Sequence, residues 1–422
     1  MASQEVRQSP GAEPQFFYGY IVVVAALFIG LTILGLYHTF GIFFKPVLTE
    51  FGWTRAMTSG AFSLSWIMQG LLAIVMGGLT DRLGARIVLT LCGSLLGLGY
   101  LLMSQIGAVW QLYLFYGVII GVGMSGAVVP LLSTVAKWFL KRRSMITGIV
   151  LTSSGIGTLI APPVVSRLIS AYDWRVSYII LGSVVLVVVV LAAQFLKRDP
   201  VQMGQIPYGE SVGREQELKS ETGGFSLKEA VYASQFWVVF AMFFCTAFCT
   251  FTVMVHIIPH TTDLGISATT AANILAAIGG VNIISRVVLG SAADRIGNRQ
   301  VYIIGFILMS AAFFWLVPAT QIWMLYLFAV IFGLAHGGTG TLSSPLVAGL
   351  FGLSSHGLIF GVLGLGITIG GAVGPFVAGY IFDVTGSYQL AFLVCAAIGT
   401  AGLILAVLLT PIRGKQGKIM TI

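Results

Sequence analysis

The chain has 422 residues, of which 57% are hydrophobic and only 9% are charged, and its formal net charge is +8. Ordinary soluble domains carry about 25% charged residues, so this composition excludes a water-facing surface of normal chemistry and predicts a polytopic membrane protein. The strong apolar runs are too long for barrel strands and lack their alternation. We therefore expect an all-α integral membrane fold.

Twelve apolar runs, each long enough to cross the hydrocarbon core, predict twelve transmembrane helices. In chain order they cover about 17–44, 57–80, 86–106, 109–137, 144–170, 176–197, 232–258, 266–293, 299–318, 322–350, 357–382 and 388–411. Between the sixth and seventh runs, charge, glycine and proline predict a linker. The predicted regions are a tail (1–16), a six-helix bundle (17–198), a linker (199–231), a second six-helix bundle (232–412) and a tail (413–422).

Lysine and arginine gather on one side of the predicted membrane. Of the 22 such residues, seventeen fall in the tails, the linker or loops of that side, and one, Arg286, lies inside an apolar run. The other side carries only Lys45, Arg55, Arg167 and Arg175. This asymmetry predicts that both termini and the linker are cytoplasmic. We expect a multi-pass protein of the cell (inner or plasma) membrane, whose partner is the lipid bilayer and not nucleic acid.

An internal repeat supports the division into two halves. GGLTDRLGAR (77–86) and GSAADRIGNR (290–299) share the frame G-x-x-x-D-R-x-G-x-R at an offset of 213 residues. The same offset pairs Pro46 with Pro259, Gly52 with Gly265, Gly157 with Gly370 and Pro162 with Pro375. Parallel, pseudo-symmetric halves with a binding site between them near the midplane are typical of one large class of secondary transporter.

The duplicated loop resembles the signature of the major facilitator superfamily, and the resemblance covers essentially the whole chain. It implies that the loop latches one conformational state. We also expect Gly77 and Gly290 to let helices approach closely. The alternative is that the motif serves only topology and turn chemistry. The residues to which we assign gating are Gly77, Asp81, Arg82, Gly84, Arg86, Gly290, Asp294, Arg295, Gly297 and Arg299.

Two stretches resemble the monocarboxylate transporter branch of that superfamily. The first is KWFLKRRSMITGIVLTSSGIG (137–157), and the second is the apolar run that contains Arg286. The resemblance implies that Arg286 binds the substrate carboxylate. Members of the branch usually carry an aspartate four residues earlier, implicated in proton coupling, and this chain has Asn282 there.

Arg286 is also singled out by its own chemistry. A cation in the middle of a membrane helix costs about 2.5–3.5 kcal/mol on insertion scales. Its repeat partner is Ala73, so a symmetric scaffold does not require it, and none of the 14 Asp and Glu falls inside a predicted span. A guanidinium fork suits one carboxylate. A structural arginine is the alternative. Related dicarboxylate exchangers carry a second cation in the eleventh helix, whereas the run 357–382 has no Lys or Arg, so the resemblance implies a monoanion rather than a dianion.

Other polar groups are weaker candidates. Asn282 could bond a hydroxyl or keto oxygen of the substrate, or join helices. Histidines titrate near physiological pH, so His336, then His38 and His256, are candidates for proton coupling, each with a structural role as the alternative. The proton could also simply accompany the carboxylate. Aromatic and amide side chains could line the cavity or pack helices: Tyr37, Gln69, Tyr116, Gln194 and Tyr326.

No sequence pattern indicates catalysis, a cofactor or a metal. GVGMSG (121–126) fits a dinucleotide fingerprint, but it lies in an apolar run without the required strand. We expect a functional monomer that is not an enzyme. The predicted function is secondary active transport of small organic anions, lactate- or pyruvate-like monocarboxylates, by proton-coupled symport. The alternatives are an organic-anion exchanger, a drug efflux carrier of the same fold, or a protein of another class, a non-transporting sensor or a membrane enzyme.

Overall fold

The computed structural model describes residues 17–139, 143–197, 200, 203, 224–352 and 355–410, without the side chains of 81, 136, 143–145 and 294. Within these residues the fold is helical, and 12 segments are long and apolar enough to cross a membrane. The prediction of twelve spans is confirmed. The tails at 1–16 and 413–422, and most of the predicted linker, lie outside the described residues.

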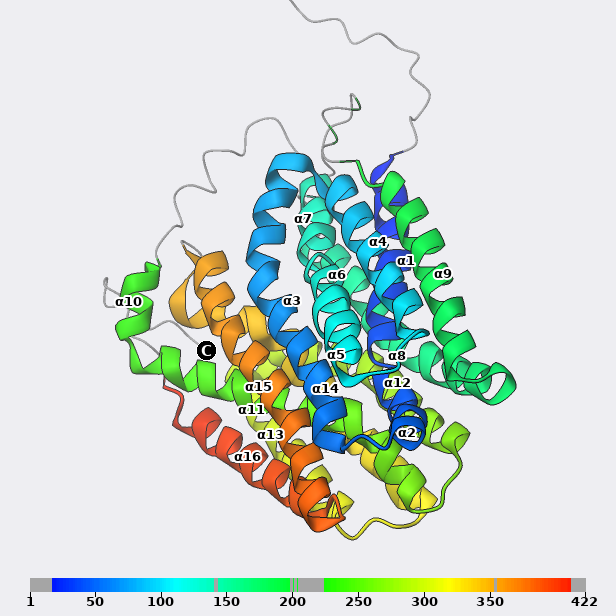
Figure 1. The fold of residues 1–422 in the computed structure, drawn as a ribbon. Helices are drawn as coiled ribbons and strands as arrows, with labels where there is room; N and C mark the ends of the chain where they lie inside the picture. Colours follow the sequence, from blue (N-terminus) through cyan, green and yellow to red (C-terminus); the bar gives the residue numbers. More distant parts are fainter. Residues whose placement is uncertain are drawn as a thin grey trace, which may run out of the picture.

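The first half of the chain forms one bundle, whose helices lie together in Figure 1. Its first predicted span continues to Phe51 as two helices, and its fourth is interrupted near Gly126, because proline occupies the first turn of the helix that follows. The elements are α1 (Gly19–Tyr37), α2 (Phe40–Phe51), α3 (Arg55–Leu83), α4 (Ala85–Met103), α5 (Val109–Leu112), the π-helix η1 (Tyr113–Ile120), α6 (Gly121–Ser125), α7 (Val129–Trp138), α8 (Arg143–Tyr172) and α9 (Trp174–Gln194).

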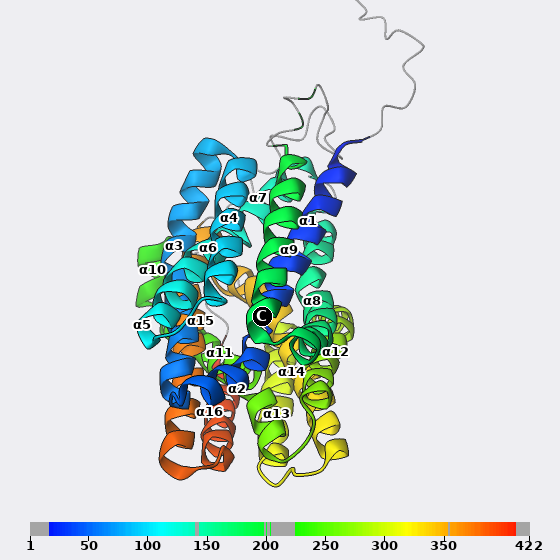
Figure 2. The ribbon, with the colours of Figure 1, turned by 45° about the vertical axis from the view of Figure 1, so that its right-hand side comes forward.

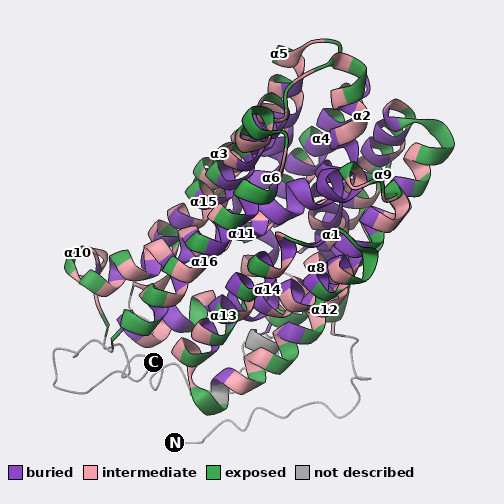
Figure 3. Ribbon diagram, turned by 90° about the horizontal axis from the view of Figure 1, so that it is seen from below, coloured by how far each residue is buried: buried purple, intermediate pink, exposed green. Residues whose placement is uncertain are grey.

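The second half forms the other bundle, entered through a short helix with a capping box at Ser226 and Glu229. Buried side chains fill the interior of both bundles, and exposed apolar ones face outward, where lipid would lie (Figure 3). The elements are α10 (Leu227–Tyr232), α11 (Ser234–Asp263), α12 (Ala268–Ile296), α13 (Asn298–Leu316), α14 (Ile322–Phe351), α15 (His356–Thr385) and α16 (Gln389–Leu408).

The helix bounds reproduce the repeat found in the sequence. Three pairs of helices, α3 with α12, α4 with α13 and α8 with α15, are shifted by 213 residues at both ends. The turns that end α3 and α12 match as well, since Gly84 has φ 87° and Gly297 has φ 92°. Only glycine adopts such angles readily. The two halves are therefore copies of one six-helix design.

Two seams join the halves, one between α3 and α15 and one between α8 and α12 (Figure 2). In the first, the Ser63 hydroxyl donates to the carbonyl of Ala372 over 2.6 Å and the Trp66 indole donates to the carbonyl of Ile367 over 3.2 Å. In the second, a Cβ added to Gly279 would lie 2.8 Å from the backbone of Thr158. The backbones along this second seam are thus in close contact.

The seams are closed at one end and part at the other. We call these the Arg55 end and the Gly84 end. Toward the Gly84 end, Ile74 is 71% exposed, and no described residue lies within 4 Å of a Cβ added to Gly78 on α3 or to Gly361 on α15. On α8, an added Cβ at Gly148 would likewise meet nothing within 4 Å. The structure is therefore closed at the Arg55 end and open at the Gly84 end.

Candidate substrate-binding site

Arg286 lies on the seam between the two halves. Its Nε donates to Asn282 Oδ1 over 2.9 Å, one turn earlier on α12, and its Nη1 donates to the carbonyl of Leu151 on α8 over 3.0 Å. The Nη2 group makes no hydrogen bond in the part of the chain that the structure describes. Since a guanidinium has five N–H donors, several remain available to an anion.

No acid compensates the charge of Arg286 among the described side chains. The three ion pairs described all lie at the Arg55 end and none includes Arg286. Asn282 is 4% exposed, and its Nδ2 has no hydrogen-bond partner in the described part of the chain. A buried donor without an acceptor is unfavourable unless a ligand or water supplies one. Arg286 and Asn282 together therefore present, at one place, hydrogen-bond donors that are unsatisfied among the described residues.

His336 lies beside this pair because glycines bring α14 against α12. A Cβ added to Gly337 would lie 2.7 Å from the carbonyl oxygen of Asn282. Nδ1 of His336 lies 3.4 Å from the Thr250 hydroxyl. His38 follows α1 in the other half, and its Nδ1 is buried without a partner among the described residues. Arg286, Asn282 and His336 are thus neighbours.

Tyr37 and Tyr116 belong to an aromatic layer inside the first half. Tyr37 is 2% exposed, stacks on Trp66 with ring centroids 6.0 Å apart, and places its hydroxyl 3.3 Å from that of Ser65. The Tyr116 hydroxyl is buried and unpartnered among the described residues. Trp66 in turn contacts Phe251 of the second half, at 4.1 Å between centroids. This aromatic layer therefore lines the seam between the two halves.

Two predicted site residues lie elsewhere. Tyr326 is eleven residues before Gly337 on α14, which places it about 16 Å toward the Arg55 end at 1.5 Å per residue. His256 is fully buried at the Arg55 end, where Nδ1 bonds the Tyr388 hydroxyl at 2.9 Å and Nε2 bonds the carbonyl of Pro375 at 2.8 Å. His256 is therefore not a neighbour of Arg286.

The repeated loop residues contact their own halves at the Gly84 end. Nε of Arg86 donates to Gln194 Oε1 on α9 over 2.8 Å, and Arg299 donates to the carbonyls of Ala406 and Val407 on α16. Gln194 and Val407 are themselves 213 residues apart. Arg82 and Arg295 are exposed, and the side chains of Asp81 and Asp294 lie outside the described residues. Gln194 thus holds a loop arginine rather than lining the site.

The prediction that Gly77 and Gly290 allow close helix approach is wrong for this state. A Cβ added to Gly77 would meet Val129 at 3.5 Å, and one added to Gly290 would meet Thr341 at 3.8 Å. Both are ordinary contacts. The glycines that the fold requires in the motif are Gly84 and Gly297, through their positive φ.

Some residues that join the two halves are not among the predicted site residues. At the Arg55 end, Arg55 of the first half contacts Asp263, Asp383 and Tyr388 of the second. A signal for them existed, since Arg55 is one of four cations on the sparsely charged side. Gln69, which the sequence does offer as a possible lining residue, is the repeat partner of Asn282, and its buried Oε1 is unpartnered among the described residues. Among the described residues, no three His, Cys, Asp or Glu side chains gather as a metal site would require.

Comparisons with known proteins agree on the architecture. The family model described as Major Facilitator Superfamily matches residues 22–290 and 239–419. Monocarboxylate transporter 12 of Rattus norvegicus is 26% identical, covering 92% of this chain and 85% of its own length. Monocarboxylate transporter 13 of Bos taurus is 27% identical, covering 92% and 88%. A bacterial homolog of the human lysosomal transporter Spinster, solved in an inward-facing and unoccupied conformation, superposes with a TM-score of 0.70 at 16% identity over 94% of this chain and 95% of its own.

Proposed function

The chain belongs to the major facilitator superfamily, whose members are non-enzymatic membrane carriers, and from this we propose that it transports small monocarboxylates of lactate or pyruvate size. The observation that carries the proposal is Arg286, a half-buried cation on the seam between the halves with no acid beside it among the described side chains. A carboxylate would accept from its remaining N–H groups. The names of the relatives support this substrate class.

The charge of the site favours one carboxylate over two. Arg286 supplies a single positive charge, and the α15 sequence contains no Lys or Arg that could hold a second carboxylate. Moving an unpaired carboxylate out of water costs several kcal/mol, so a dianion would enter with one charge uncompensated. Asn282 Nδ2, next to the guanidinium, would donate to a carboxylate, hydroxyl or keto oxygen. We therefore propose a monoanion.

The two seams support a proposal of transport by alternating access. The described state is open at the Gly84 end, where the basic loops lie, and the positive-inside rule puts that end in the cytoplasm. We propose that this state faces inward and that bundles 17–198 and 232–412 rock about a binding site at the membrane depth of Arg286. We also propose that the functional unit is a monomer in the cell membrane. The named inward-facing neighbour supports the orientation.

We propose proton-coupled symport, with His336 and His38 as the proton-binding groups. His336 lies beside Asn282 and Arg286, and His38 belongs to the other half, so an anion bound near either ring would favour its charged form. The second candidate is anion exchange, which Asn282 favours because it cannot carry a proton where relatives of the branch usually have an acid. Net uptake under a pH gradient alone separates the two, since an obligate exchanger shows none.

Uptake into proteoliposomes tests the proposal. We expect the wild-type protein to accumulate lactate when the outside is more acidic, and Arg286→Ala to abolish uptake while still inserting and folding. Arg167→Ala, which removes an exposed cation near the Arg55 end of α8, is the control and should transport normally. Undiminished uptake by Arg286→Ala would refute the assigned site.

A further inference from the structure

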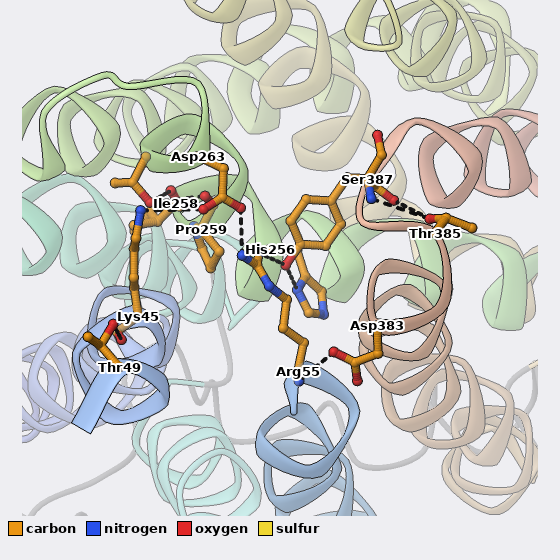
Figure 4. Close-up of polar contacts among 12 residues, drawn as sticks. Lys45, Thr49, Arg55, His256, Ile258, Pro259, Asp263, Asp383, Thr385 and Ser387 are labelled. Atoms are coloured by element: carbon orange, nitrogen blue, oxygen red, sulfur yellow. Dashed lines mark hydrogen bonds and ion pairs between the residues drawn. The ribbon is translucent and has the colours of Figure 1, made fainter. Parts of the chain in front are cut away.

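At the Arg55 end, Arg55 of the first half contacts several residues of the second half (Figure 4). Its Nη2 lies 2.7 Å from Asp263 Oδ2 on α11, its Nη1 donates to the Tyr388 hydroxyl over 2.7 Å, and its guanidinium lies 3.5 Å from the centre of the Phe382 ring. The Arg55 side chain is only 13% exposed. An ion pair shielded in this way is worth more than an exposed one. By contrast Lys45, which also pairs with Asp263, is 44% exposed and contributes less.

The backbone of Arg55 is held as well. Asp383 on α15 accepts from the amide of Arg55 over 2.8 Å and from the amide of Ala56 over 2.7 Å. These are the first two amides of α3, which have no acceptor within their own helix. A carboxylate also suits the positive end of the helix dipole. An acid of the second half thus caps a helix of the first.

His256 holds the Tyr388 hydroxyl in the orientation that Arg55 needs. The carbonyl of Pro375 can only accept, so Nε2 of His256 donates to it and Nδ1 of the neutral ring accepts from the Tyr388 O–H. The oxygen of Tyr388 is then left to accept from Arg55. The Arg55 contact is thereby tied to the buried interior of the second half.

The repeat shows why this contact crosses between the halves. Glu50, the repeat partner of Asp263, is neutralised inside its own half by Arg175 at 2.5 Å, with a further bond from the Trp174 indole at 2.7 Å. At the offset of 213, Arg175 corresponds to Tyr388, and neither neighbour of Tyr388 in the sequence is charged. Asp263 therefore lacks a cation of its own half at that place, and Arg55 supplies it from the other half.

We propose that Arg55, Asp263, Asp383 and Tyr388 form a clasp that holds the carrier closed at the Arg55 end. Opening that end separates α3 from α11 and α15, so every one of these bonds must break. The clasp therefore sets the ratio of the two states. Because Tyr388 stands where the first half has Arg175, Asp263 depends on Arg55 for its cation. The inference rests on the proposed alternation between two states and not on the identity of the substrate.

Distances between spin labels test the clasp without any substrate. One pair, Tyr172→Cys with Gln321→Cys, spans the halves at the Arg55 end, and a second, Leu83→Cys with Ile296→Cys, spans them at the Gly84 end. All four positions are exposed, and the four buried native cysteines are replaced beforehand. Double electron–electron resonance on the purified carrier then gives the population of each state.

Two variants attack the clasp from opposite sides. Arg55→Gln removes the shared cation, and Tyr388→Arg gives Asp263 a cation of its own half. For both we expect longer distances at the Arg55 end, shorter ones at the Gly84 end, and an about tenfold shift in the ratio of states. Glu50→Gln, which breaks the equivalent pair inside one half, is the matched control and should leave the distances unchanged.

The outcomes separate clearly. If Tyr388→Arg and Arg55→Gln elute and melt as folded proteins yet keep wild-type distances at both ends, the clasp is refuted. If Glu50→Gln shifts the distances as far as they do, the effect is one of stability in that layer and the clasp is again refuted. Failure of lactate transport alters neither reading, since the labels report on the protein alone.

Discussion

Arg286 and Asn282 lie one turn apart on α12, and Nε of the arginine donates to Oδ1 of the amide over 2.9 Å. The amide orients the guanidinium without neutralising it. An aspartate at that position would orient the guanidinium equally well and cancel its charge. The amide therefore leaves the site with one positive charge that an anion can balance.

Changing Asn282 to aspartate should weaken anion binding. The new carboxylate would pair with Arg286 and compete with the substrate, so we expect an about tenfold higher Kd for lactate at pH 7.5. Because protonation removes the competitor, affinity should recover as the pH falls. Isothermal titration between pH 5 and 8 measures both effects. Asn282→Ser, which adds no charge, is the control, and a pH-independent Kd in Asn282→Asp would contradict the account.

Replacing His336 by glutamine should separate binding from proton coupling. If the ring carries the coupled proton, the variant loses its acceleration of lactate uptake by external acid, while counterflow at equal pH continues. His356→Gln removes a histidine at the Gly84 end that bonds the Ser344 hydroxyl, and it should retain the wild-type pH profile. Uptake measured across pH 6–8 in both variants makes the comparison. An unaltered profile in His336→Gln would assign the proton elsewhere.

The contact between α1 and α8 should tolerate no side chain at Gly157. An added Cβ would lie 2.6 Å from Gly35 Cα and 2.8 Å from the carbonyl oxygen of Leu31. Both are backbone atoms that cannot rotate away, so Gly157→Ala should lower the free energy of unfolding by about 1–3 kcal/mol. Gly148→Ala on the same helix meets nothing within 4 Å and should stabilise by up to about 1 kcal/mol. Measuring the unfolding of both variants in the same detergent tests this prediction. Equal stabilities of the two variants would contradict the packing described.

Much of the fold could be predicted from the sequence because its signals are local. Span length follows from hydropathy, and the turns at Gly84 and Gly297 follow from a repeated motif whose glycines adopt positive φ. Arg286 and Asn282 are one turn apart on a helix, so their contact follows from helical spacing alone. His336 is a candidate by its chemistry, and its nearness to Asn282 follows from the packing of α14 on α12.

The remaining features depend on which helices meet. Arg55 and Asp383 are more than 300 residues apart, and their contact exists only because α3 and α15 form one seam. Tyr326 shares α14 with His336, and His256 lies on α11, yet their positions along these helices place them away from Arg286. The interruption of the fourth span near Gly126 also differs from its unbroken counterpart α14. Hydropathy does not distinguish these cases.

The central claim is that Arg286 binds the single carboxylate of the substrate. A thermal-shift panel of mono- and dicarboxylates on the purified wild type, Arg286→Ala and the control Arg167→Ala tests it most directly. We predict that one or more monocarboxylates raise the melting temperature of the wild type and of Arg167→Ala, that dicarboxylates do not, and that Arg286→Ala shows no shift. Equal stabilisation of Arg286→Ala by the same acid would contradict the account.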